Sequence, residues 1–162
     1  MRKFTVDAML GKLALWLRLT GHDTRYSTDM HDDELLHVSL DEGRILITSD
    51  AELYERSQNQ NLESLLLRGS VDEGVAHVFA QYKIPPKIDP TKSRCSKCNG
   101  NLVALKNADK DRVKELVFEK TFDHYEEFWM CEDCTSVFFQ GGHWKNIELY
   151  MKRISDLIEK LA

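Results

Sequence analysis

The sequence contains little proline and no long apolar run. Its three prolines all lie between residues 85 and 90, which excludes a collagen-like chain and a long proline-rich disordered tract. No segment approaches the ~18 consecutive apolar residues that a membrane-spanning helix requires. The N-terminal segment reaches an acidic residue at Asp7 before an apolar signal-peptide core can form. We therefore expect a soluble, cytoplasmic protein with no membrane partner.

The sequence also lacks the excess of basic residues that is typical of nucleic-acid-binding proteins. Its formal net charge is −5. The first 90 residues contain 10 Lys and Arg against 15 Asp and Glu, whereas residues 91–162 contain 12 of each kind. A phosphate-bearing partner would therefore have to be bound by local basic patches or through bound cations.

The four cysteines form two pairs of equal spacing, Cys95 with Cys98 and Cys131 with Cys134. Two CxxC turns can direct four thiolates at one Zn²⁺ ion in a tetrahedral site. The alternative of local disulfides or unrelated thiols is disfavoured in a reducing compartment. We interpret residues 93–144 as a zinc ribbon with structural Zn²⁺, in which each cysteine turn opens a β-hairpin.

The two turns carry different residues after their second cysteine. Asn99 and Gly100 suit the left-handed backbone that such a hairpin needs. Thr135, at the matching place in the second turn, is β-branched and disfavours a positive φ. We therefore expect the second turn to have a different shape.

Apolar strand patterns alternate with helical patterns in the first half of the chain. Strands are expected near residues 3–6, 23–26, 44–48 and 62–67, each followed by a helix. This alternation predicts a parallel sheet in an α/β sandwich.

The prolines between residues 84 and 90 mark a boundary, because they stiffen the chain and forbid a helix. We therefore divide the chain into a first domain over 1–88, the ribbon over 93–144 and a C-terminal segment over 145–162. Apolar residues at helical spacing predict that this last segment is an amphipathic helix that packs on the body of the protein.

Acidic residues follow the first three predicted strands. Asp7 follows the first strand, Asp29 and Asp32 follow the second, and Asp50 follows the third. The carboxyl ends of parallel strands share one edge, where open α/β sheets bind ligands. Converging carboxylates require a cation, and oxygen ligands select Mg²⁺ or Mn²⁺, which can promote phosphodiester hydrolysis. Each Asp alone, Asp32 above all, also fits a helix N-cap.

Several ordered motifs resemble the Mut7-C family. They are FxVDxMLGxLAxWLRxxG at 4–21, DxELL at 32–36, GRILxTxD at 43–50, SRCxxCN at 93–99, CxxC at 131–134 and GHW at 142–144. The resemblance spans nearly the whole chain. It implies a PIN-like ribonuclease domain, a three-layer α/β sandwich with a central parallel sheet, followed by a small four-cysteine zinc ribbon and a C-terminal helix.

The resemblance also implies roles for individual residues. Asp7, Asp32 and Asp50 would form the acidic catalytic site, with Asp7 and Asp50 holding Mg²⁺ or Mn²⁺. Thr48 would orient the acid that follows it, Asp50, and Asp72 is the candidate fourth acid because it opens the helix after the fourth strand. The candidate RNA-binding residues are Lys12, Arg18, Arg44, Arg56, Lys92, Arg94, Lys97, His143 and Trp144.

The leading hypothesis is a metal-dependent ribonuclease, an endonuclease of single-stranded RNA, whose ribbon aids RNA or protein binding. A second is a non-catalytic RNA-binding or ribosome-associated adaptor, whose RNA binding would need no divalent ion. A third, a phospho-acceptor receiver domain, is disfavoured because Asp7 is followed by Ala8 and not by a second acid, and because the fourth strand ends at Leu67 and Arg68 without a lysine.

Overall fold

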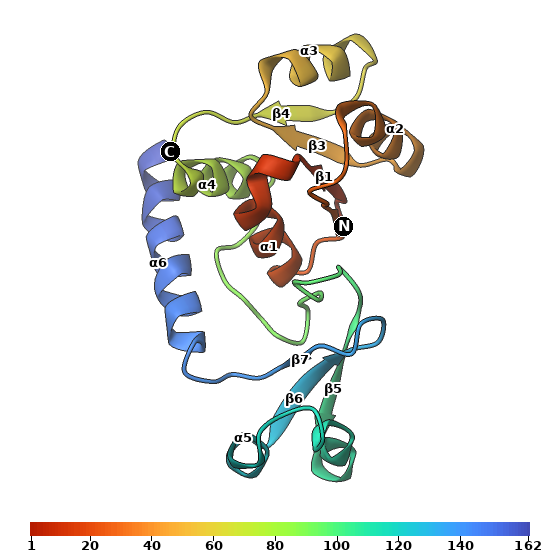
Figure 1. Ribbon diagram of the computed structural model, residues 1–162. Coiled ribbons are helices and arrows are strands. Elements are labelled where there is room, and N and C mark those ends of the chain that lie inside the picture. Colours follow the sequence, from red (N-terminus) through yellow and green to blue (C-terminus); the bar gives the residue numbers. More distant parts are fainter.

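The computed structural model describes residues 1–162 and contains two β-sheets, one above the other in Figure 1. The upper sheet is parallel, in the order β2-β1-β3-β4, with β1 at Phe4–Val6, β2 at Thr24–Arg25, β3 at Ile45–Thr48 and β4 at Ser64–Leu66. From β1 the chain continues to β2 on one side, and from β3 it continues to β4 on the other. The carboxyl ends of β1 and β3 therefore flank a topological switch point, where α/β sheets bind ligands.

Helices cover both faces of this sheet, which confirms the predicted α/β fold. One face is covered by α1 (Gly11–Leu19) and α4 (Val71–Gln81), and α6 (Trp144–Leu161) packs on these two helices. Together they form the main hydrophobic core. Phe4 and Val6 of β1 point into this core. A short 3-10 turn, η1 (Ala8–Leu10), connects β1 to α1.

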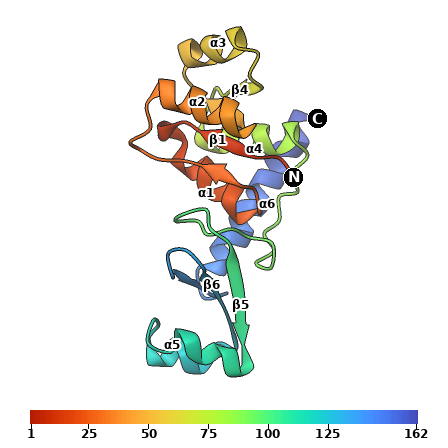
Figure 2. The ribbon, with the colours of Figure 1, turned by 90° about the vertical axis from the view of Figure 1, so that its right-hand side faces the viewer.

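The opposite face packs against α2 (Asp32–Glu42) and α3 (Ala51–Asn59) around a smaller core that contains Leu46. Ile45 and Ile47, the neighbours of Leu46 in β3, lie in the main core, because side chains alternate between the two faces of a strand. Figure 2 shows α2 and α1 on opposite sides of β1.

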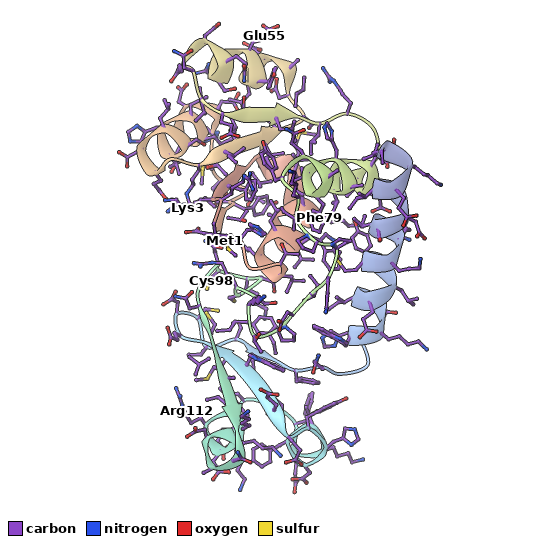
Figure 3. The ribbon with its side chains drawn as sticks, turned by 180° about the vertical axis from the view of Figure 1, so that it is seen from behind. Met1, Lys3, Glu55, Phe79, Cys98 and Arg112 are labelled. Atoms are coloured by element: carbon purple, nitrogen blue, oxygen red, sulfur yellow. The ribbon has the colours of Figure 1, made fainter.

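The C-terminal helix α6 packs on the body of the protein, as the spacing of its apolar residues predicts. Met151 and Ile154 are buried in the main core, and Tyr150 stacks on Trp16 of α1 with ring centroids 4.4 Å apart. Figure 3 shows α6 beside α4, the helix that contains the labelled Phe79, and the two helices are in contact. No helix of the protein has both the length and the apolar composition needed to cross a membrane.

The lower sheet is antiparallel, in the order β5-β6-β7. Its strands are β5 (Leu102–Lys106), β6 (Glu127–Cys131) and β7 (Val137–Phe138). An insertion between β5 and β6 contains η2 (Asn107–Val113) and the short helix α5 (Glu119–His124). Strands and insertion share a third, small core, so this part of the chain has little apolar packing of its own.

The two cysteine turns have the same backbone shape, and the expectation of a different second turn is wrong. Asn99 has a φ of 73° and Thr135 a φ of 60°, both in the left-handed region. The Asn99 N–H donates to the Cys95 carbonyl at 2.9 Å, and the Thr135 N–H donates to the Cys131 carbonyl at 3.1 Å. These equivalent hydrogen bonds and the convergence of the cysteines impose the turn despite its cost for a β-branched residue.

Candidate functional site

Asp7 lies at the switch point, directly after β1. Its backbone N–H donates to the carbonyl of Ile47 in β3, and its side chain is only 9% exposed. Its Oδ2 accepts a hydrogen bond from the Thr48 hydroxyl at 2.8 Å, and its Oδ1 has no hydrogen-bond partner in the protein. One carboxylate oxygen of Asp7 is therefore held in place and the other is available to a ligand.

Thr48 joins the ends of β1 and β3. Its Oγ1 accepts a hydrogen bond from the Asp50 backbone N–H at 3.0 Å. A hydroxyl has a single proton to donate, and that of Thr48 goes to Asp7. Thr48 therefore orients the carboxylate of Asp7, across the sheet, and only the backbone of Asp50. This differs from the expectation that it orients the Asp50 carboxylate.

Asp50 is exposed and is the N-cap of α3. Its Oδ1 accepts hydrogen bonds from the N–H groups of Glu52 at 2.9 Å and Leu53 at 3.3 Å. Such a cap satisfies backbone donors that have no partner within the helix. The second oxygen of Asp50 makes no hydrogen bond within the protein, so capping leaves it free for a ligand.

Asp32 is the first residue of α2, but it is not a cap. The N-cap position is occupied by His31, and no side chain caps this helix. Asp32 itself makes no side-chain hydrogen bond, whereas its neighbour Asp33 pairs with Arg56 of α3. That hydrogen bond raises the pKa of Arg56, which also feels the charge of Asp32. Arg56 is thus a cation among the acids at the N-terminal ends of α2 and α3.

Asp72 has another role. Its Oδ1 accepts a hydrogen bond from the Tyr150 hydroxyl at 2.8 Å, and its Oδ2 pairs with Nε of Arg153 at 3.2 Å. Burial and the hydrogen bond with Asp72 raise the pKa of Tyr150. Both oxygens of this carboxylate are thus engaged by α6, and the structure gives Asp72 the role of tying α6 to α4.

The four cysteines form a centre whose ligand atoms all lie within 4.8 Å of one another. The Sγ atoms of Cys98 and Cys131 are 3.4 Å apart, and those of Cys95 and Cys134 are 3.7 Å apart. Disulfide sulfurs would be ~2.05 Å apart. Tetrahedral zinc with Zn–S bonds of ~2.3 Å places its sulfurs about 3.8 Å apart. The donor set and its spacing therefore fit a structural zinc ion.

The first cysteine turn is fastened to the edge of the parallel sheet. The Asn99 side chain accepts a hydrogen bond from the Thr24 N–H at 2.9 Å through Oδ1 and donates one to Asp23 at 2.7 Å through Nδ2. Arg18 of α1 donates to the carbonyls of Thr24 and Ser96, both at 3.1 Å. Asn99 thus satisfies a free donor of edge strand β2, and Arg18 joins α1 to the turn. Figure 3 shows the labelled Cys98 where the two parts of the molecule meet.

Two of the predicted RNA-binding arginines are buried at this junction. Arg18 and Arg44 are each 6% exposed. Arg44 donates to the carbonyls of Phe4 and Asp23 and pairs with the carboxylates of Asp23 and Glu42. The structure therefore gives both arginines a structural role in place of the contact with RNA expected from the sequence.

The remaining basic candidates differ in exposure. Lys12, Lys92 and Lys97 are exposed, and Arg94 is half-buried with only its Nε engaged, by Asn99. His143 is exposed, with its ring edge-on to Phe139 at 5.9 Å, and Trp144 is half-buried at the start of α6. That these residues contact RNA stays a prediction.

Two hollows adjoin these residues. One, of about 460 Å³, lies beside the switch point between the start of α1 and the start of α4. The other, of about 470 Å³, lies at the junction of β2 with the first cysteine turn. Arg25, Tyr26 and Arg68 line one or both of them and were not among the sequence-based candidates. Arg68 lies two residues after the end of β4, so its position near the end of a strand could have identified it from the sequence.

The family model of the Mut7-C RNAse domain matches residues 2–151. The matched span contains the acids at the switch point and all four cysteines. Comparisons with curated proteins and with solved structures gave no match.

Proposed function

We propose that this chain, which belongs to the Mut7-C RNAse domain family, is a PIN-like, metal-dependent endonuclease of single-stranded RNA. The family match supports RNA as the substrate. We locate the active site at Asp7, because this buried carboxylate lies at the switch point of the sheet and has one oxygen without a hydrogen-bond partner.

Asp7 and Asp50 are the residues that would hold Mg²⁺ or Mn²⁺. Each offers a carboxylate oxygen with no partner in the protein, and these ions prefer oxygen ligands. When bound, such an ion lowers the pKa of a water ligand and neutralises charge on the phosphate. Thr48 keeps the Asp7 carboxylate in one orientation, and Asp32, which has no hydrogen-bond partner, can accept a proton from the attacking water.

The zinc ribbon would aid RNA binding at the junction groove. Four arginines line this groove, Arg18, Arg25, Arg44 and Arg94, against the two acids Asp23 and Asp133. Arg18 and Arg44 are largely occupied, and Arg25 forms an ion pair with Glu42 at 3.7 Å. The Arg25 side chain is nevertheless 45% exposed, and the terminal NH groups of Arg94 make no hydrogen bond within the protein. These two arginines are therefore the cations of the groove that phosphate groups could reach, although the chain as a whole is acidic.

The proposed activity is tested by cleavage of a single-stranded RNA with Mn²⁺ by the zinc-loaded, full-length protein. We expect Asp7→Asn to lower the rate about 100-fold or more, because a metal ligand is lost. Asp41→Asn, which removes an exposed acid at the far end of α2, is the matched control and should cleave at the wild-type rate. Equal rates for wild type and Asp7→Asn would refute the assignment. Divalent ions are withheld, not chelated, in the metal-free control, so that zinc stays bound.

A second candidate is a non-catalytic RNA-binding adaptor that meets a protein or ribosome partner through the ribbon. The spacing of the acids favours it, because Asp7, Asp32 and Asp50 do not converge within 4.8 Å as the cysteines do. RNA binding that is equal with and without Mn²⁺, and equal in Asp7→Asn, with no cleavage, would support the adaptor over the nuclease.

A further inference from the structure

The cavity beside the switch point is built by residues that follow all four strands, with Tyr26 directly after β2. Residues 8–13 come directly after Asp7, Ser49 lies between Thr48 and Asp50, and residues 67–71 connect β4 to α4. Figure 1 shows α1 and α4 side by side below the strands, and the two helices are in contact. A ligand in this cavity would therefore lie next to the acidic edge.

The charge of the cavity differs from that of the chain. None of the 15 residues that line it is acidic, although the protein has 27 Asp and Glu residues and a net charge of −5. Two of the lining residues, Lys12 and Arg68, are exposed cations. The hydroxyls of Ser49 and Ser70 also line it. The cavity is therefore suited to an anionic ligand beside a site that is otherwise acidic.

Apolar side chains line the rest of the cavity. Met9 is 81% exposed and Val71 is 51% exposed, which is unusual for large apolar residues, and they come from opposite sides of the cavity. Leu10 and Leu67 lie with them among the lining residues, and Tyr26 adds an aromatic ring. Apolar and aromatic surfaces of this kind bind the faces of nucleobases without selecting their sequence.

The wall that carries Tyr26 is fixed. The Tyr26 hydroxyl donates to the carbonyl of Ala8 at 2.8 Å. A Cβ atom at Gly11 would lie 2.7 Å from the Tyr26 oxygen, so only glycine lets the ring approach α1 in this way. The cavity, of about 460 Å³, is thus a preformed hollow within the ~300–1,000 Å³ usual for ligand sites.

From these features we infer that the cavity binds one unstacked nucleotide of the RNA, next to the phosphodiester bond that is cleaved. The base lies against Met9 and Val71, and the flanking phosphates are bound by Lys12 and Arg68. This inference rests on the proposed function and deepens it. A base can enter such a hollow only when it has left a helical stack, so the site selects single strands over duplexes.

The test measures binding apart from cleavage. Fluorescence anisotropy of a labelled 12-nucleotide oligouridylate is followed with the zinc-loaded, full-length Asp7→Asn protein, without added Mg²⁺ or Mn²⁺. Lys12→Ala and Arg68→Ala should each weaken binding about three- to tenfold and lower the slope of log K against log salt by about 0.7. Met9→Glu and Val71→Glu should weaken binding on the order of tenfold, and Met9→Ala by less.

Matched controls lie outside the cavity. Leu149→Glu changes an apolar residue of α6 that is 59% exposed, and Lys120→Ala removes an exposed cation of the ribbon insertion. Both should bind like the parent protein, and a duplex of the same length should bind at least about tenfold more weakly than the single strand. Parental affinity in all five cavity variants, or equal affinity for duplex and single strand, would overturn the inference.

The outcome for the cavity is separable from the outcome for the nuclease. If the wild-type protein fails to cleave RNA with Mn²⁺ but the cavity variants still lose binding, the nucleotide site stands and the nuclease proposal fails. If the protein cleaves RNA and the cavity variants bind and cleave normally, the nuclease stands and the nucleotide site fails. Crosslinking of an RNA that contains 4-thiouridine to the peptide with Met9 or Tyr26 would locate the base directly.

Discussion

The cysteine centre and the acidic edge are two sets of potential ligand side chains that this fold arranges in opposite ways. The four thiols converge within 4.8 Å from two turns far apart in sequence. The carboxylates of Asp7 and Asp50 instead have separate hydrogen-bond partners, Thr48 and the N-terminus of α3. We therefore expect the cysteine centre to need its ion to hold the chain together. The acidic residues are held in place by the sheet and by α3, so we expect them to bind and release an ion without a loss of structure.

The cysteine centre is also attached to the sheet, through the first cysteine turn. Asn99, one residue after Cys98, binds the edge strand β2, and Arg18 connects the same turn to α1. We therefore expect zinc binding to order not only the ribbon but also its attachment to the domain that carries the acids. Removal of zinc from the cysteine centre should lower stability, and removal of Mg²⁺ or Mn²⁺ from the acidic edge should lower activity.

The largest effect is expected for loss of zinc. Cys95 is fully buried, and Cys95→Ser removes one of four ligands from a module with a small apolar core. Structural zinc in finger peptides contributes ~10–16 kcal/mol of apparent binding free energy, which is folding free energy for such modules. We expect residues 93–142 to become sensitive to protease in limited proteolysis. Withholding Mg²⁺ and Mn²⁺ from the wild-type protein is the comparison and should leave the digestion pattern unchanged. Continued protection of that segment in Cys95→Ser would contradict a structural zinc.

A change that is mainly in activity is expected at the acidic edge. Thr48→Val removes the hydroxyl that orients Asp7 with little change in shape. Loss of such a group beside a metal ligand typically costs ~10–100-fold in affinity or activity. We expect Mn²⁺-dependent cleavage to fall by this factor, while the free energy of unfolding falls by ~1–3 kcal/mol, because the Asp7 carboxylate and the Asp50 N–H lose their partner. Thr48→Ser, which keeps the hydroxyl, should restore most of the rate. Full activity in Thr48→Val would show that the hydrogen bond to Asp7 is not used in the reaction.

A smaller effect is expected at the junction. Asn99→Gly deletes the side chain that bonds Thr24 and Asp23, while glycine accepts the φ of 73° without strain. The unpaired Thr24 N–H should lower the free energy of unfolding by ~1–3 kcal/mol in urea denaturation. Asn99→Ala should cost more than Asn99→Gly, because it adds backbone strain to the same loss. If both variants unfold at the wild-type urea concentration, Asn99 does not fasten the turn to the sheet.

The smallest effect concerns pH. Burial acts to raise the pKa of Asp23, but hydrogen bonds from Arg44 and Asn99 outweigh it and lower the pKa below its ordinary value of 3.8. The folded state therefore gains stability from this carboxylate above pH 3.8, and it loses that gain as the pH falls through the lower folded pKa. Between pH 5 and pH 3, the stability advantage of the wild type over Asp23→Asn should shrink in urea denaturation. An advantage that is the same at both pH values would argue against an ionised Asp23 at the junction.

The order of the elements and the identity of the cysteine centre could be predicted from the sequence, because both depend on local patterns. The apolar run over 45–47 becomes β3, and the equal spacing of the two cysteine pairs becomes a four-thiol centre. The acids after the strands could be placed at one edge for the same reason. A strand end is visible in the sequence, and parallel topology brings strand ends together.

Contacts with backbone carbonyls could not be predicted, because every residue has a carbonyl and the sequence does not show which one accepts a given hydrogen bond. Arg18 and Arg44 are typical candidates for RNA contacts by residue type, yet their donors are taken by carbonyls of Thr24, Ser96, Phe4 and Asp23. Asp72 binds Tyr150 and Arg153 of α6, which lie 78 or more residues further along the chain. For Thr135, the demands of the cysteine turn outweigh the local preference that the prediction used.

The most direct test of the account is a calorimetric titration of the zinc-loaded protein with Mn²⁺, comparing wild type with Asp7→Asn. We predict that the wild type binds Mn²⁺ at a site separate from zinc, and that Asp7→Asn loses this binding while its zinc content and thermal unfolding stay unchanged. Identical Mn²⁺ binding by the two proteins, or none by either, would contradict a metal site at the acidic edge.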